Sequence, residues 1–189
     1  ELEDYSSNGW LKKENYLDNN IRLEVINTFL FLCKKFSPIT FKNLNSKSIN
    51  DLEVHNMIVD FRNKDPKGFG KVYEIMQSSV SLKTLALSYK LQRLASLLLN
   101  TDASKIMLRN SILRVDVPRD ERNTVDWHYD VFSGDLSNHK AKGGISIVIP
   151  LTEFSIDNGA PIICEGSHKN CPDQTISVSE LNSSSKYEN

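Results

Sequence analysis

The residues best suited to chemistry in this sequence of 189 residues are a histidine and an aspartate separated by one tyrosine, His128 and Asp130. In an extended segment, residues i and i+2 point to the same face, so this imidazole and this carboxylate are expected to converge. They would supply two of the three ligands of a 2-His-1-carboxylate facial triad, which leaves the opposite face of Fe(II) open. We therefore predict that His128 and Asp130 are catalytic metal ligands. Because His-x-Asp pairs also occur by chance, the surrounding sequence must decide.

The three other histidines stand in different contexts. His55 lies in a predicted helix beside apolar residues and is interpreted as a surface or boundary residue. His139 lies in the polar, turn-like stretch at residues 137–140 and is interpreted in the same way. His168, within a Gly-Ser-His-Lys sequence, is the remaining candidate for a ligand.

Short motifs flank His128 on both sides. Upstream, residues 114–118 read Arg-Val-Asp-Val-Pro, and Trp127 immediately precedes the histidine. Downstream come a glycine-led apolar run at 143–151, Asp-Asn-Gly-Ala-Pro at 157–161 and Glu-Gly-Ser-His-Lys at 165–169. This order resembles the phytanoyl-CoA dioxygenase-like family, whose members read R-x-D-x-P, W-H-x-D, an apolar strand, N-G and P-G-S-H-K. A glutamate replaces the proline of the last motif, and the resemblance covers roughly residues 113–169.

The resemblance implies an Fe(II)- and 2-oxoglutarate-dependent dioxygenase that hydroxylates a small organic substrate. Its cofactor and cosubstrates would be Fe(II), 2-oxoglutarate and O₂, and it would couple decarboxylation of 2-oxoglutarate to hydroxylation of a C–H bond. The resemblance also places Asn110 and Arg114 on the segment that often contacts 2-oxoglutarate in the family, so they are the candidate cosubstrate-binding residues. Asp130 is a carboxylate, whereas halogenases of the family carry a small residue at that position, so hydroxylation is expected.

The second histidine of the triad is not evident. In the family it lies on a late strand after the Gly-Ser-His-Lys turn and is followed by an arginine for 2-oxoglutarate, but neither residue type follows His168 here. The chain starts at Glu1 and stops in a polar, serine-rich stretch, so we expect a piece of a longer protein with the third ligand beyond Asn189. His168 as an unusual third ligand is the less favoured alternative.

A second interpretation comes from a different class of protein: a non-catalytic double-stranded β-helix that serves as a binding module and lacks a complete metal triad. The missing distal histidine and arginine are its support. A cupin-type metal enzyme that does not use 2-oxoglutarate is disfavoured, because cupins usually present two closely spaced histidines and a glutamate, a pattern absent from this sequence.

The secondary structure that must position these residues is predicted to change from helices to strands near Thr101. Before it, apolar periodicity predicts helices from residues 19–20 to about 36, over 49–62 and over 81–99. After it, β-branched runs at 106–117, 144–151 and 160–164 predict strands. We expect one oxygenase domain over 1–189, with a mainly helical part (1–100) and an incomplete β core (101–189). The predicted fold class is α+β or mostly β: a double-stranded β-helix (jelly-roll, cupin-like) with an N-terminal helical layer, its C-terminal strands missing.

Composition narrows the classes of partner. The formal net charge of −1 and the scattered lysines and arginines predict binding neither to nucleic acid nor to an anionic membrane. Three cysteines without metal-finger spacing predict a reducing compartment, and we expect a cytoplasmic protein. No apolar stretch approaches the roughly 18 residues of a membrane span. A small-molecule substrate is the expected partner, and the sequence does not predict an oligomeric state.

Overall fold

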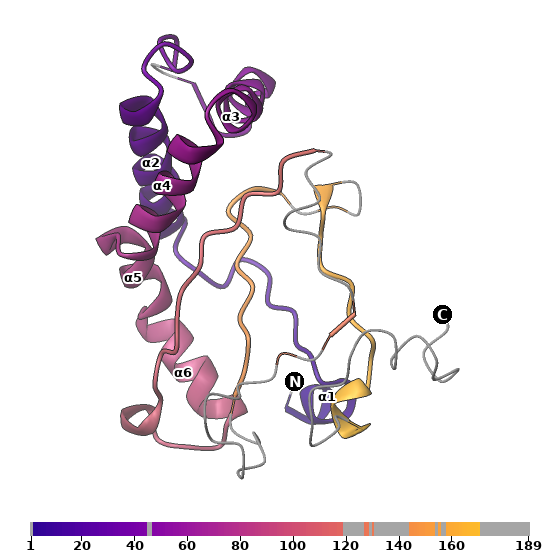
Figure 1. The fold of residues 1–189 in the computed structure, drawn as a ribbon. Coiled ribbons are helices and arrows are strands. Elements are labelled where there is room, and N and C mark those ends of the chain that lie inside the picture. Colours follow the sequence, from indigo (N-terminus) through magenta and orange to yellow (C-terminus); the bar gives the residue numbers. More distant parts are fainter. Residues whose placement is uncertain are drawn as a thin grey trace.

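The first half of the chain is built from α-helices (Figure 1). The computed structural model describes residues 2–44, 47–118, 127, 128, 130, 144–153, 155 and 158–170. Its helices are α1 (Leu2–Asn8), α2 (Asn19–Phe36), α3 (Leu52–Lys64), α4 (Pro66–Gln77), α5 (Val80–Ala86) and α6 (Tyr89–Leu98). Two short 3₁₀ helices follow, η1 (Ala103–Lys105) and η4 (Ser167–Asn170).

Local capping signals explain where the long helices begin. The side chain of Asp18 accepts a hydrogen bond of 2.8 Å from the amide of Asn20 and caps α2. At the start of α4, Asp65 accepts from the amide of Gly68 at 2.8 Å. Pro66 occupies the first turn of α4, where a missing N–H costs nothing.

The hydrophobic core lies among helices α2 to α5. Four aromatic rings run through it in series, with centroids 6.0 Å apart for Phe41 and Phe61, 5.4 Å for Phe61 and Phe69, and 5.4 Å for Phe69 and Tyr73. The first two contacts are edge-to-face, the arrangement that the charge distribution of aromatic rings favours. This aromatic series connects the middle of the helical core to the residue that holds the second half of the chain.

One predicted helix is two helices. The prediction of a single helix over residues 81–99 was wrong, because the chain breaks at Leu87 and Ser88 between α5 and α6. Ser88 is extended, with a ψ of 142°, as expected for a residue that precedes a helix. The break turns Leu87 outward, so that it is exposed, whereas Leu91 is buried.

The prediction of a double-stranded β-helix is contradicted. The described residues contain helices and irregular segments but no strand, and this includes all three predicted strands at 106–117, 144–151 and 160–164. Among these residues, no backbone hydrogen bond joins one of the three segments to another. Strand propensity mainly reflects how well a side chain fits a half-buried surface. For the segment at 106–117, the helical core provides that surface.

The segment at 106–117 keeps the two-residue alternation of a strand without belonging to a sheet. Leu113 and Val117 are buried in the helical core, and Val115 packs against it, whereas Arg114 and Asp116 between them are exposed. Figure 1 shows this segment, in salmon, running along the helices. The β-branched run was predicted to be a strand of a sheet, whereas the structure packs one side of this segment on the helices.

Side chains from the helices hold the second half of the chain. The hydroxyl of Tyr73 on α4 donates to the carbonyl of Val115 at 2.9 Å and accepts from the amide of Val115 at 2.7 Å. Lys83 on α5 donates to the hydroxyl of Ser111 at 3.0 Å, and Arg22 on α2 donates to the carbonyl of Leu151. Tyr73 thus gives Val115 the donor and acceptor that an adjacent strand would otherwise supply.

We expect Tyr73→Phe to lower the free energy of unfolding by about 1–3 kcal/mol, because it removes two hydrogen bonds of about 0.5–1.5 kcal/mol each. Tyr89→Phe is the matched control, since this tyrosine is exposed on α6 and should change stability by less than about 0.5 kcal/mol. Urea unfolding followed by circular dichroism measures both. Equal stability of the two variants would show that the bonds to Val115 contribute nothing.

Cys33 on α2 is fully buried in the core. Burial raises the pKa of the Cys33 thiol from 9.0 to about 12, because the thiolate loses its hydration. The thiol therefore stays neutral in the folded protein, and it favours folding below pH 9. This contribution is lost as the pH rises from 9 towards 12, since the unfolded chain then releases the proton first.

We expect iodoacetamide at pH 8 to alkylate Cys164 at least about 100-fold faster than Cys33, because only the thiolate is nucleophilic. Cys164 is partly exposed and serves as the internal reference. Peptide mass spectrometry over time gives both rates, and a denaturant should remove the difference. Similar rates in the native protein would contradict the burial of Cys33.

No helix in the described part of the chain is long and apolar enough to cross a bilayer.

Candidate metal site

The structure brings the side chains of His128 and Asp130 together. Nε2 of His128 and Oδ1 of Asp130 lie 3.3 Å apart. Both side chains reach solvent, with 52% of His128 and 55% of Asp130 exposed. The two functional groups therefore converge on one point that a solute can approach, as the i, i+2 rule predicts for an extended segment.

This separation fits two donors on one metal ion. With metal–donor bonds of about 2.1 Å, two ligands at right angles lie about 3.0 Å apart. The observed 3.3 Å is close to that value. A nitrogen and a carboxylate oxygen are also donors that Fe(II) accepts in facial-triad sites. A direct ion pair between a protonated His128 and Asp130 has the same separation, so metal titration is needed to distinguish the two.

The described residues contain no group of three or more histidine, cysteine, aspartate or glutamate side chains that could hold a metal ion. Within this part of the chain the candidate site consists of the side chains of His128 and Asp130 alone. The predicted third ligand beyond Asn189 lies outside the described residues.

His168, the alternative third ligand, has another partner. It belongs to η4, and its Nε2 lies 3.1 Å from the carbonyl oxygen of Ser6 in α1. Because a carbonyl only accepts, Nε2 carries the proton in this contact. A metal ion would have to replace this hydrogen bond to bind His168 through Nε2.

The candidate cosubstrate residues Asn110 and Arg114 are exposed on the segment at 106–117. Nε of Arg114 lies 2.9 Å from both carboxylate oxygens of Asp116. A carboxylate of this protein therefore already engages the guanidinium that was predicted to bind a carboxylate of 2-oxoglutarate.

The sequence analysis did not predict this contact between Arg114 and Asp116. The sequence does contain a pattern that indicates it, because Arg114 and Asp116 have the same i, i+2 spacing as His128 and Asp130. The rule that predicted the convergence of the metal ligands thus predicts this ion pair as well.

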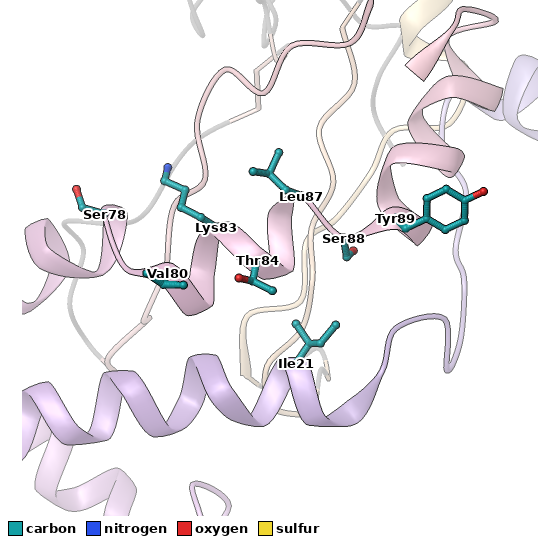
Figure 2. A pocket seen from close by; sticks show the side chains of 8 residues that line it. All are labelled: Ile21, Ser78, Val80, Lys83, Thr84, Leu87, Ser88 and Tyr89. Carbon is teal, nitrogen blue, oxygen red and sulfur yellow. The ribbon is translucent and has the colours of Figure 1, made fainter. Parts of the chain in front are cut away.

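A hollow of about 470 Å³ lies between the start of α2 and the junction of α5 and α6 (Figure 2). Its lining residues are Ile21, Ser78, Val80, Lys83, Thr84, Leu87, Ser88 and Tyr89. Figure 2 shows Thr84 pointing towards Ile21 on α2, while the amine of Lys83 points away from it. The lining includes none of the predicted site residues, so the hollow is separate from the candidate metal site.

Comparison with known proteins gives no family assignment, because no protein-family model, no curated protein and no solved structure matches this chain.

Proposed function

We propose that this protein is an Fe(II)- and 2-oxoglutarate-dependent oxygenase that hydroxylates a small organic substrate. The observation that carries the proposal is the 3.3 Å separation between Nε2 of His128 and Oδ1 of Asp130. The order of the flanking sequence motifs supports it independently, because the motifs place this pair where the phytanoyl-CoA dioxygenase-like family has its metal ligands.

The residues have separate roles in this proposal. His128 and Asp130 hold the ion through one imidazole nitrogen and one carboxylate oxygen, and their exposure lets solutes reach it. A ferrous ion bound there, together with 2-oxoglutarate, supplies the activation of O₂ that hydroxylation requires.

Arg114 is the proposed contact for a carboxylate of 2-oxoglutarate. Its guanidinium can bind a carboxylate through two parallel hydrogen bonds. Asp116 holds it in the free protein, so binding of 2-oxoglutarate would exchange one carboxylate partner for another. Asn110 lies on the same segment and has both a donor and an acceptor for a second polar contact.

The test is an anaerobic calorimetric titration of the metal-free protein with Fe(II), followed by measurement of succinate after 2-oxoglutarate and O₂ are added. We expect one Fe(II) per chain and succinate formation above that of Fe(II) alone. Mg²⁺ in place of Fe(II) is the control and should give no succinate, because it has no accessible redox chemistry. Absence of Fe(II) binding would contradict the proposal and leave the His128–Asp130 contact as an ion pair.

A further inference from the structure

The N-terminal residues contact the turn that carries His168. The amide of Gly166 donates to the carbonyl of Asn8 at 2.8 Å, and Nε2 of His168 donates to the carbonyl of Ser6 at 3.1 Å. The indole N–H of Trp10 donates to Oε1 of Glu165 at 3.2 Å. Three hydrogen bonds thus join residues 6–10 to residues 165–168, which are far apart in the sequence.

The backbone of Gly9 lies close to the imidazole ring of His168. It ends α1 in the left-handed region, with φ +81°, and its amide donates to the carbonyl of Tyr5 at 2.8 Å. A Cβ at Gly9 would lie 2.2 Å from Nδ1 of His168, closer than any real contact allows. Glycine is therefore required here for two reasons, the backbone conformation and the imidazole ring beside it.

Helix α1 takes no part in the hydrophobic core. None of its residues is buried, and the core and the residues packed against it begin at Leu17. The hydrogen bonds of Trp10 and His168 to the other segment are exposed to solvent. The N-terminal residues can therefore separate from the turn without opening the core.

The chain is fixed to the helices again just after this region. The hydroxyl of Tyr16 donates to the carbonyl of Lys90 at 3.0 Å, and Nζ of Lys90 donates to the carbonyl of Tyr16 at 2.9 Å. Residues on the N-terminal side of Tyr16 would move about this point when they separate from the turn.

We infer that residues 2–10 form a releasable strap that closes over the turn at 165–168, and that His168 is its latch. The closed strap keeps Nε2 of His168 bonded to Ser6 and the carboxylate of Glu165 bonded to Trp10. Release frees an imidazole and a carboxylate for another ligand. The strap thus controls access to two side chains that have no role in the core.

The test is amide hydrogen exchange followed by NMR on metal-free protein, so that its result is independent of the proposed oxygenase activity. The amide of Gly166 reports closure directly, because its acceptor is in the strap. We expect its exchange to become at least about tenfold faster in His168→Ala and in Gly9→Ala. A tenfold change in the closing equilibrium is equivalent to about 1.4 kcal/mol. Lys169→Ala is the matched control from the same turn and should leave the rate unchanged.

Hydrogen exchange of amides in the core distinguishes release of the strap from unfolding of the whole protein. The amides of Phe61 and Val72 should exchange at the same rate in all three variants, since neither helix contributes to the strap. If they accelerate together with Gly166, α1 is part of the cooperative core and the strap does not exist. Unchanged exchange of Gly166 in both His168→Ala and Gly9→Ala would equally overturn the inference.

The double variant Gly9→Ala/His168→Ala distinguishes the effect of the contact between Gly9 and His168 from the effect of backbone strain at Gly9. If Gly9 acts through its contact with His168, then Gly9→Ala should add little to the effect of His168→Ala. Full additivity would mean that Gly9→Ala acts only through its left-handed backbone, and would exclude a contribution of the contact between Gly9 and His168 to closure.

Discussion

Replacing Phe61 with alanine should lower the free energy of unfolding by about 3–5 kcal/mol, the range typical of truncating a buried aromatic residue. Phe61 is fully buried on α3 and lies edge-to-face with both Phe41 and Phe69. Its ring is the second of the four in the aromatic series, so its removal leaves a cavity and breaks two ring contacts together. A loss of this size is a large part of the stability of a typical domain.

Phe31→Ala is the matched control for Phe61→Ala. Phe31 lies on α2 with 62% of its surface exposed, and its truncation should change stability by less than about 0.5 kcal/mol. Urea unfolding followed at 222 nm measures both variants. Phe61→Leu should show a smaller loss than Phe61→Ala and remains measurable if the alanine variant does not fold. Equal effects of Phe31→Ala and Phe61→Ala would contradict a core centred on the helices.

The second large effect concerns the metal site. We expect His128→Ala to weaken Fe(II) binding at least about 100-fold, equivalent to about 2.7 kcal/mol. Asp130→Ala should have an effect of similar size, because each variant removes one of the two proposed protein ligands. Both variants should also abolish succinate formation, since without a bound ion nothing activates O₂.

Two other histidines provide the controls for this experiment. His55→Ala should leave Fe(II) affinity unchanged, because His55 is an exposed residue of α3. His168→Ala should also leave it unchanged, because Nε2 of His168 is bonded to Ser6. A loss in His168→Ala as large as in His128→Ala would instead identify His168 as the third ligand. Unchanged affinity in His128→Ala and Asp130→Ala would place the metal elsewhere.

Helices α2 and α3 could be predicted from the sequence because their signals are local, whereas α1 was not predicted. The periodicity of apolar residues in α2 gave its end at Phe36. The break at Ser88 was missed, because the leucines around it keep a helical spacing on both sides. The strand predictions at 106–117, 144–151 and 160–164 were wrong for a different reason. A β-branched run predicts an extended chain with one apolar face, but it does not identify the surface that covers this face.

In the candidate site, too, contacts between residues close in the sequence could be predicted and contacts between distant residues could not. The convergence of His128 and Asp130 follows from their spacing, as does the pairing of Arg114 with Asp116. The contact of His168 with Ser6 joins residues 162 positions apart, and no pattern in the sequence indicates it. Whether His128 and Asp130 bind iron stays a prediction, because their geometry fits both a metal ion and an ion pair.

The apolar side chains that prompted the strand predictions have a consequence for the handling of the protein. Ile112, Val148 and Ile162 are 63%, 62% and 71% exposed, and each lies in a run of high strand propensity. Runs of this kind add readily to strands of other chains, and native proteins usually shield them with charged residues or proline. Among the described residues, a helical surface covers only one side of the segment at 106–117. Its outer side is therefore a starting point for aggregation, and concentrated solutions of the protein should precipitate through this part before the helices unfold.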